Sequence, residues 1–428
     1  MSDFDHIEVI NKVWFERRDI ISDGFDKALY ALKNACPAVK IVEYSTGSKV
    51  WTWKIPPKWE VKEAWVKANG NKIIDILDHP LHVMSYSIPV SKKIDHDELM
   101  NHLYTIPENP DGIPFEFSYY KEKWGFCLEH NKLSDLNYEE YEVFIDSTFS
   151  DGTLKVGEIF IPGSSGREII LIAHLCHPCQ VDDDLTGVVA LLSLSEKLRK
   201  HKNHYSYRIL IVPETIGTIA HLANNDEILE SADFGICLGS LGNKNNLSLQ
   251  QSRTGHSMLD LAAKNVLRET SIIHRVGKFG EVIGNDEKVL ESPGVNIPTI
   301  SLTRCQPWLE GRPFPEYHSS LDTPEIITLE RIIEIEDIVE KILMQLNSNF
   351  YPIPKFKGPI YLTPLNLWID PRKDPQYLIK INELMQLLHE DDLSMIEIAN
   401  RLEISYSLLM EWVDTFEKNE LLSRKAIE

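Results

Sequence analysis

The sequence predicts an α/β protein built on a doubly wound, largely parallel β-sheet. One observation is the apolar run Ile169–Ala173, which has the length and β-branched content of a strand buried on both faces. A polar loop follows this run, and the apolar segment Val188–Leu194 then begins a helical stretch. Further strand-like runs alternate with helical stretches through the rest of this region, and such alternation is typical of a sheet whose strands are joined by helices.

The composition indicates a globular protein with one large core and smaller units. The chain has 428 residues, of which 43% are hydrophobic, and this length exceeds that of one typical domain. Its 65 acidic and 44 basic residues give a formal net charge of −21, which argues against a protein that binds nucleic-acid phosphates. We find no export signal and no run long enough to cross a membrane, so we expect a cytoplasmic protein whose six cysteines are reduced thiols.

The region before the α/β pattern contains two different patterns of apolar residues. Apolar residues at helical spacing over Asp5–Ala35 predict two helices that are separated near Ser22–Gly24. Over Ile41–Phe117, short alternating runs between turn signals predict a small β-rich unit. We therefore assign residues 1–36 and 125–350 to the α/β domain, and residues 37–124 to a β-rich insert.

An aromatic cluster follows the β-rich unit and includes Tyr119, Tyr120 and Trp124. Its aromatic rings either pack in the core or line a substrate pocket, and the sequence leaves both interpretations open.

The α/β pattern itself begins at Glu142. We expect strands at residues 143–146, 155–161, 169–173, 207–212 and 234–238, and helices at residues 187–199, 256–270 and 329–346. The proline-rich residues 351–374 then indicate a linker.

The C-terminal segment, residues 375–428, resembles a winged helix-turn-helix. Its charge does not suit DNA, because eleven acidic residues stand against five basic ones. Glu411, Asp414 and Glu417 occupy the helix that would read the groove, where arginine, lysine or asparagine is expected. We therefore favour a module for protein–protein contact or homo-oligomerisation over a DNA-binding module.

Polar residues with metal-binding chemistry follow several of the expected strands. His174, His177 and the acidic run Asp182–Asp184 come directly after the buried strand. Imidazole and carboxylate side chains on such a loop are typical zinc ligands. Glu214 follows the next strand, and two later stretches carry the remaining candidates: Asp286 and Glu287, then Tyr317, His318 and Asp322.

The same loop contains Cys176 and Cys179 in a CxxC spacing. A redox CxxC motif needs a depressed thiol pKa. The acidic residues that follow would raise the thiol pKa, so we favour a metal-ligand loop over a redox site.

These segments resemble the zinc aminopeptidase family, which includes bacterial leucyl aminopeptidases and glutamate carboxypeptidases. The resemblance covers residues 142–345 and is carried by the stretches AHLCHPCQVDDDLTG, PETIG, GND and EYHSSLD. The whole chain is more closely similar to bacterial aminopeptidase-like proteins described with polysaccharide biosynthesis, in which a β-rich insert and a winged-helix tail accompany the catalytic domain.

The resemblance implies a role for each matching residue. It makes His174 a ligand of one zinc ion, Asp183 a bridging carboxylate and His318 a ligand of the second ion. Glu214 takes the position of the general base that activates zinc-bound water. Tyr317 is implied to stabilise the oxyanion, and Asp286 falls on a loop that lies near the substrate in the carboxypeptidases.

Three departures from the family pattern concern the metal ligands. Thr215 stands where the family has a second acid, the strand at 234–238 ends without a carboxylate, and Cys176 replaces an acid that orients the first ligand. We expect one or two zinc ions, with His177 or Glu287 as possible extra ligands. Cys176, Asp286, Asp322 and Trp124 are predicted to contact the substrate or to support the ligands.

We therefore predict a metal-dependent, aminopeptidase-type amide hydrolase that acts on a small peptide or an aminoacylated substrate. The incomplete ligand set leaves an alternative, a non-catalytic or regulatory protein that binds a ligand. A third hypothesis, removal of an N-acyl group from a sugar derivative, depends only on the association of similar proteins with polysaccharide biosynthesis.

Overall fold

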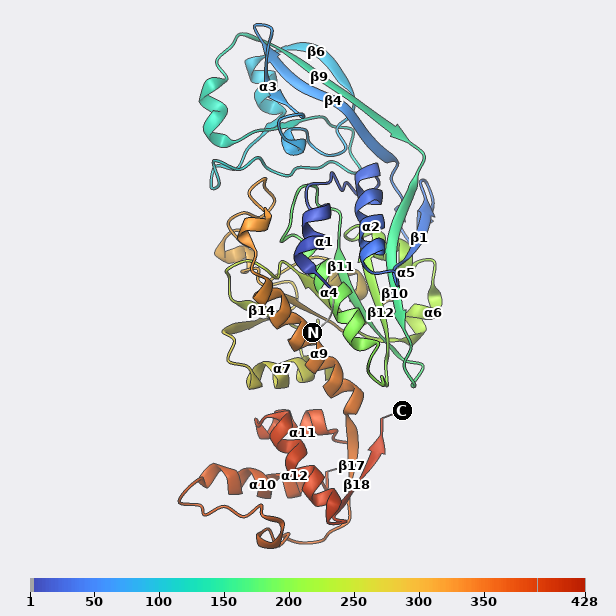
Figure 1. Cartoon of the computed structure of the whole chain (residues 1–428), viewed down its shortest axis with the longest axis vertical. Coiled ribbons are helices and arrows are strands. Elements are labelled where there is room, and N and C mark those ends of the chain that lie inside the picture. The colour runs from blue at the N-terminus through green and yellow to red at the C-terminus, as the bar shows by residue number, and fades with distance from the viewer. Residues whose placement is uncertain (1–3, 391, 428) are drawn as a thin grey trace.

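The computed structural model describes residues 4–390 and 392–427, which form three parts arranged along the long axis of the molecule. Figure 1 shows the β-rich insert at one end, the α/β domain in the middle and the C-terminal segment at the other end. This order means that the α/β domain contacts both of the smaller parts.

The α/β domain is built on an eight-stranded sheet with the order β1-β10-β12-β11-β13-β16-β14-β15. Its four central strands are parallel, whereas β10 runs antiparallel to β12 and β14 runs antiparallel to β16. The predicted parallel sheet is therefore present at the centre and is flanked by antiparallel neighbours. The strands are β1 (Lys40–Ser45), β10 (Thr153–Ile161), β11 (Glu168–His174), β12 (Ser206–Val212), β13 (Ala232–Gly239), β14 (Leu247–Gln250), β15 (His274–Gly277) and β16 (Thr299–Thr303).

The central strand β11 is buried along its whole length, as its apolar sequence requires. Helix α4 (Leu185–Leu198) follows it and packs on β11, and α1 and α9 contact α4 to complete one helical layer (Figure 1). The Asp184 side chain caps α4 by accepting a hydrogen bond from the backbone N–H of Gly187 at 3.1 Å. The other helices of this domain are α1 (His6–Val13), α2 (Asp23–Ala35), α5 (Ile216–Leu222), α6 (Asp226–Ser231), α7 (Met258–Glu269), α8 (Glu287–Leu290) and α9 (Leu329–Ser348).

The insert contains a four-stranded antiparallel sheet with the order β5-β4-β9-β6. The insert strands are β2 (Lys49–Val50), β3 (Trp53–Lys54), β4 (Lys58–Ala68), β5 (Asn71–Asp75), β6 (Val90–Asp95), β7 (Leu103–Tyr104), β8 (Phe126–Cys127) and β9 (Glu140–Ser150), with helix α3 at His96–Asn101.

Two strands lie in different sheets from those that the sequence predicted. The predicted strand 143–146 is part of β9, which pairs with β4 and β6 in the insert rather than with the central sheet. Strand β1 lies within residues 37–124 but pairs with β10 at the edge of the central sheet. Burial alternates along most of β9, a pattern typical of a strand with one solvated face. The sequence pattern of this strand does not indicate which sheet it joins.

The C-terminal segment has three helices among its described residues, and its strand β18 (Leu422–Ala426) pairs antiparallel with β17 (Phe350–Pro354), which directly follows α9. Its helices are α10 (Pro375–Leu387), α11 (Met395–Leu402) and α12 (Tyr406–Lys418). The predicted linker 351–374 is therefore partly strand. The winged-helix assignment stays a prediction.

The C-terminal segment is docked on the α/β domain through α11 and α7. The Asn400 side-chain amide donates to the carbonyl of Leu261 at 3.0 Å, and the Ile396 N–H donates to the side chain of Asn349 at 3.1 Å. On α12, Asp414 and Glu417 form ion pairs with an arginine of β18 at 2.7 and 2.9 Å. The acidic face of α12 is thus partly neutralised within the chain.

Two findings concern the expected compartment. All six cysteines are free and buried. Within the described residues, no helix combines the length and apolar character that a membrane span requires.

A buried histidine on α5 predicts a loss of stability in mild acid. His221 is 1% exposed, and its Nδ1 lies 2.9 Å from the Tyr44 hydroxyl. Burial, together with the nearby charge of Arg208, lowers the pKa of His221 to about 4. Because the unfolded pKa is about 6.5, the unfolded chain binds a proton between these values and the folded chain does not. Stability is therefore lost as the pH falls from about 6.5 towards 4.

We expect this histidine to contribute about 2 kcal/mol to the stability difference between pH 7 and pH 5. His221→Gln should reduce the difference by that amount in urea unfolding at the two pH values. An unchanged difference in the variant would show that His221 does not contribute to this pH dependence.

Candidate metal centre and active site

Three histidines and one aspartate meet beyond the carboxyl end of β11. His174 Nε2 lies 3.2 Å from Asp183 Oδ1, and His318 Nε2 lies 3.1 Å from Asp183 Oδ2. His177 joins this cluster, with its Nδ1 3.0 Å from His174 Nδ1. The structure therefore brings together the three predicted ligands and one of the two predicted extra ligands, although they come from loops far apart in the sequence.

The cluster offers two overlapping groups of possible metal ligands. In the first group, ligand atoms of His177, Asp183 and His318 lie within 4.8 Å of one another. In the second group, ligand atoms of His174, Cys176 and His177 meet the same criterion. A zinc site normally uses three protein ligands and one open position, so the first group has the composition of a hydrolytic zinc site.

Unpartnered polar atoms in this cluster fit a bound cation. His174 Nε2, Asp183 Oδ2 and His318 Nε2 are buried and form no well-aligned hydrogen bond within the described residues, although the histidine–carboxylate contacts are only 3.1–3.2 Å long. Buried polar atoms are normally paired, because an unpaired one costs free energy. Imidazole nitrogens beside a carboxylate oxygen are the donor set that zinc prefers, so the residues present fit this ion.

The protonation states of the cluster agree with metal binding. Burial would raise the pKa of Asp183, but the neighbouring histidines, His177 first among them, hold it well below its ordinary value. Burial lowers the pKa of His177 well below 6.5. An ionised carboxylate and a neutral imidazole are the forms that bind zinc.

His174 differs from His177 in its charge environment. Burial alone would lower the pKa of His174, but its close contacts with Asp183 and Cys176 and the charge of Asp184 raise it well above 6.5. Without a bound cation, His174 is therefore the histidine that takes up a proton to balance Asp183.

The other two acids of the run Asp182–Asp184 hold the loops in place. Asp184 accepts hydrogen bonds from the backbone N–H groups of His174 at 3.2 Å and Ser240 at 3.1 Å. Asp182 accepts from the backbone N–H of Gly242 and the side chain of Asn243, both at 2.6 Å. Only Asp183 faces the histidines, so the three acids have separate roles.

Asp322 supports the same loop from the opposite side. Its two carboxylate oxygens accept hydrogen bonds from the backbone N–H groups of Asp182 at 2.8 Å and Asp183 at 3.0 Å. Asp322 therefore positions the backbone that carries Asp183.

The loop that carries His177 is organised by Arg18, which the sequence analysis missed. This guanidinium is fully buried. Its donors reach five backbone carbonyls at 2.7–2.9 Å, those of Val13, Trp14, Leu175, His177 and Gln180. Burial lowers the pKa of Arg18 to about 10, so the guanidinium remains charged at neutral pH. In the sequence, the charged stretch from Glu16 to Asp19 resembles an ordinary solvated turn and gives no signal of this role.

Glu214 lies beside the ligand cluster, at the end of β12. One of its carboxylate oxygens is 3.9 Å from His177 Nε2, and the side chain remains 27% exposed. Burial raises the pKa of Glu214 above its ordinary value. A carboxylate with a raised pKa next to a metal site has the properties of a general base.

The turn that presents Glu214 has a strained backbone and is held in place by hydrogen bonds. Thr215 has a φ of 64°, a left-handed conformation that is rare for a β-branched residue. Asp286 accepts hydrogen bonds from the Thr215 N–H at 2.8 Å and the Thr218 hydroxyl at 2.7 Å. Asp286 therefore fixes the conformation of this turn, and we interpret the strain as a feature of the site.

Cys176 and Glu287 have different relations to the cluster. The Cys176 sulfur accepts a hydrogen bond from the Glu214 N–H at 3.1 Å and so links the His174 loop to the base. Glu287 is not among the metal-ligand groups of the described residues. Its carboxylate accepts from the Asn285 N–H at 3.0 Å, and burial raises its pKa to about 7.

The insert reaches the site through Phe115, another residue that the sequence analysis missed. Its ring centroid is 5.1 Å from that of His177 and 5.3 Å from that of His318. The Phe115 N–H donates to the His318 carbonyl at 2.9 Å, and the Ser320 N–H donates to the Ile113 carbonyl at 2.9 Å. The insert thus pairs with the loop that carries a predicted ligand.

Tyr317 stacks on the neighbouring ligand. Its ring centroid lies 4.0 Å from that of His318, with 9° between the ring planes. Burial raises the pKa of Tyr317 well above 10, so its hydroxyl keeps its proton. Tyr317 and His318 line a cavity of about 190 Å³ together with Phe115 and Trp308.

The predicted substrate contact of Trp124 is not supported. Trp124 is buried in the insert, and its ring stacks on His102 at a centroid distance of 3.6 Å. Tyr120, in contrast, is half exposed and packs edge-on against Trp53. The aromatic cluster is therefore divided between core packing and surface.

The buried thiols of the CxxC motif do not suit redox chemistry. Burial raises the pKa of Cys176, and it raises that of Cys179 to about 12. A reactive thiol needs the opposite shift. This agrees with the interpretation of the motif as part of a metal-ligand loop.

Comparison with known proteins relates most of the chain to one family. Residues 7–349 match a family model described as "Domain of unknown function (DUF4910)". A protein from Clostridium acetobutylicum, described as a candidate polysaccharide biosynthesis protein with an aminopeptidase-like domain, is 39% identical over 309 residues. That alignment covers 71% of this chain and 69% of the relative.

Solved structures extend the similarity to the fold. A crystal structure of a candidate peptidase from Clostridium acetobutylicum has a TM-score of 0.83 and 30% identity, over 98% of this chain and 96% of that chain. A zinc aminopeptidase from Bacillus subtilis has a TM-score of 0.58 and 12% identity, over 81% of this chain and 96% of that chain. The second similarity concerns the fold alone. The protein belongs to the family described as DUF4910, and its α/β domain has the fold of the zinc aminopeptidases.

Proposed function

We propose that this protein is a metal-dependent hydrolase that cleaves an amide bond, most simply the bond after an N-terminal amino acid. The observation that carries the proposal is the group His177, Asp183 and His318, whose ligand atoms meet within 4.8 Å, with a Glu214 oxygen 3.9 Å from His177 Nε2. Three ligands beside a partly exposed carboxylate form the arrangement that zinc hydrolases use.

The proposed site holds one zinc ion. His177, Asp183 and His318 supply three ligands, whereas the ring of His174 contacts a carboxylate at Asp183 Oδ1 alone among the described residues, at 3.2 Å. Thr215 and the end of β13 lack the acids that would complete a second site. We therefore assign His177 the ligand position that an acid occupies in the family pattern. His174 supports Asp183 through its contact with Oδ1. This assignment differs from the sequence-based prediction that His174 is itself a ligand.

The residues around the site have separate chemical tasks. A bound zinc ion supplies a Lewis acid that polarises a carbonyl and lowers the pKa of water. Glu214 takes a proton from the attacking water and delivers it to the leaving amine. Tyr317, which keeps its proton, is the candidate donor to the oxyanion. Phe115 excludes water from one side of the histidine cluster.

The substrate class and partners follow from the same proposal. A small peptide or an aminoacylated compound suits an aminopeptidase-type site. We propose that the C-terminal segment serves protein contact or homo-oligomerisation, because the acidic residues of α12 disfavour DNA. A non-catalytic, ligand-binding protein is the competing candidate, and the acids missing from the second metal site favour it.

Metal content tests the proposal directly. We expect about one zinc per chain, measured by elemental analysis of protein purified without chelators. His177→Ala and His318→Ala should remove the zinc, because a two-ligand site binds it weakly. His174→Ala should retain most of it.

The three variants separate the alternatives. Zinc lost equally from the His174 variant would restore His174 as a ligand and contradict the single-site assignment. Wild-type protein that takes up no zinc and cleaves no aminoacyl amide would favour the non-catalytic alternative.

A further inference from the structure

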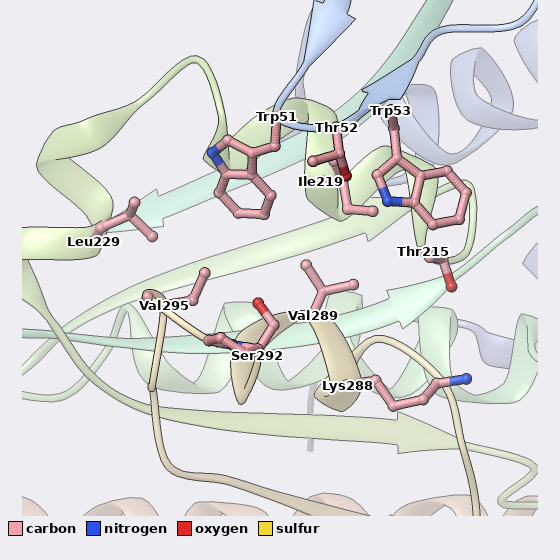
Figure 2. A pocket seen from close by; sticks show the side chains of 12 residues that line it. Trp51, Thr52, Trp53, Thr215, Ile219, Leu229, Lys288, Val289, Ser292 and Val295 are labelled. Atoms are coloured by element: carbon pink, nitrogen blue, oxygen red, sulfur yellow. The ribbon is translucent and has the colours of Figure 1, made fainter.

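A second, larger cavity lies beside the turn that carries Glu214 (Figure 2). Its volume is about 780 Å³. The β2–β3 hairpin of the insert lines the cavity with Trp51 and Trp53, α5 contributes Ile219, and Val289 of α8 lies across from the indoles. The cavity is thus built between the insert and the α/β domain.

This cavity adjoins the turn that carries Glu214. Thr215 lines it and is the residue directly after Glu214. The same turn is fixed by the hydrogen bond from Thr215 to Asp286, at 2.8 Å. A group in the cavity therefore lies beside the turn that presents Glu214.

The lining indicates an apolar occupant. The indoles of Trp51 and Trp53 remain 38% and 41% exposed, and covering apolar surface of this kind is favourable. The other described lining residues are mostly apolar, with hydroxyl or ammonium groups on Thr52, Thr215, Ser292 and Lys288. An aromatic or branched aliphatic side chain would cover the indoles and the aliphatic wall without burying polar groups of its own.

The wall of the cavity is held in position before any ligand binds. Tyr120 packs edge-on against Trp53 with a centroid distance of 5.7 Å, and its hydroxyl donates to the Lys54 carbonyl at 3.1 Å. Holding the hairpin in this way reduces the ordering that binding would otherwise require. Tyr120 thus braces the cavity wall.

We infer that this cavity is a subsite for a large apolar side chain, aromatic or branched aliphatic, on the residue next to the cleaved amide. The inference rests on the proposed function for the position of the bond. It assigns specificity to Trp51 and Trp53, which belong to the insert rather than to the α/β domain.

The test is equilibrium binding, which does not depend on turnover. Calorimetry on the zinc-loaded full chain carrying Glu214→Gln compares L-phenylalaninamide with glycinamide. We expect at least tenfold tighter binding of the phenylalanine amide. Adding Trp51→Ala or Trp53→Ala should remove most of this preference. Trp368→Ala, which changes a similarly exposed indole outside the cavity, should leave it unchanged.

The outcomes distinguish the subsite from the reaction. Equal affinity for the two amides, no binding of either, or a preference that survives both cavity variants would overturn the subsite. If the preference is present but wild-type protein cleaves no amide, the subsite stands and the proposed function fails. If wild-type protein cleaves amides without any side-chain preference, the proposed function stands and the subsite fails.

Discussion

Glu214→Gln is expected to lower kcat for a cleaved aminoacyl amide by at least about 100-fold while the zinc content stays unchanged. Glutamine has nearly the same size but cannot accept the proton of the attacking water. Glu214 is outside the group formed by His177, Asp183 and His318, so the metal should remain. Steady-state kinetics and elemental analysis on the same preparation measure both quantities.

The pH profile adds a second readout to this prediction. Burial raises the pKa of Glu214 above its ordinary value of 4.5, and only the ionised form can act as a base. The rate should therefore fall as the pH decreases through a value above 4.5. Glu227→Gln, at an exposed position on α6, serves as the control and should leave both rate and profile unchanged. Turnover that persists in the Glu214 variant would contradict the mechanism.

Arg18→Leu is expected to destabilise the protein and weaken zinc binding together. The change removes the donors that satisfy the carbonyls of Leu175, His177 and Gln180, which are 2.7–2.9 Å from the guanidinium. Leaving buried acceptors unpaired costs about 1–3 kcal/mol each, so we expect a loss of about 3 kcal/mol or more. Because Arg18 shapes the loop that presents His177, zinc affinity should fall at least tenfold.

The neighbouring Arg17→Leu is the matched control for this prediction. Arg17 is partly buried, pairs with Asp19 at 3.0 Å and lies over the Trp59 ring, and its other hydrogen bonds go to the carbonyls of Pro80 and Val83 rather than to carbonyls of the His177 loop. Unfolding in urea and zinc competition with a chelator measure the two effects. Equal losses of zinc affinity in both variants would show that Arg18 acts through general stability and has no specific effect on the loop.

The sequence predicted the central strands and part of the site because their signals are local. Strand β11 is apolar along its length and fully buried, so its pattern and its environment agree. His174, Asp183 and His318 stand in family motifs, and their side chains meet as those motifs imply. By contrast, β14 and β15 have four residues each, too few to show a period.

The residues that were missed depend on contacts distant in sequence. Arg18 is recognisable only when the carbonyls around it are known, because an arginine in a charged turn is usually solvated. Phe115 lies among other aromatic residues, and nothing local indicates that it pairs with the His318 loop. Trp124 shows the limit of an aromatic signal, since the sequence leaves open whether a ring between strands is core, as its stacking on His102 now indicates, or pocket wall.

The pairing between the insert and the His318 loop also has a consequence for the order of events during synthesis. The hydrogen bond from the Ile113 N–H to the Ser320 hydroxyl joins positions 207 residues apart. The ribosome makes the insert, His177 and Asp183 well before His318, so the nascent chain holds only two of the three proposed ligands during this interval. Two ligands do not form a stable zinc site. The proposed metal centre would therefore be completed late, when the emerging His318 segment docks onto an insert that has already left the ribosome.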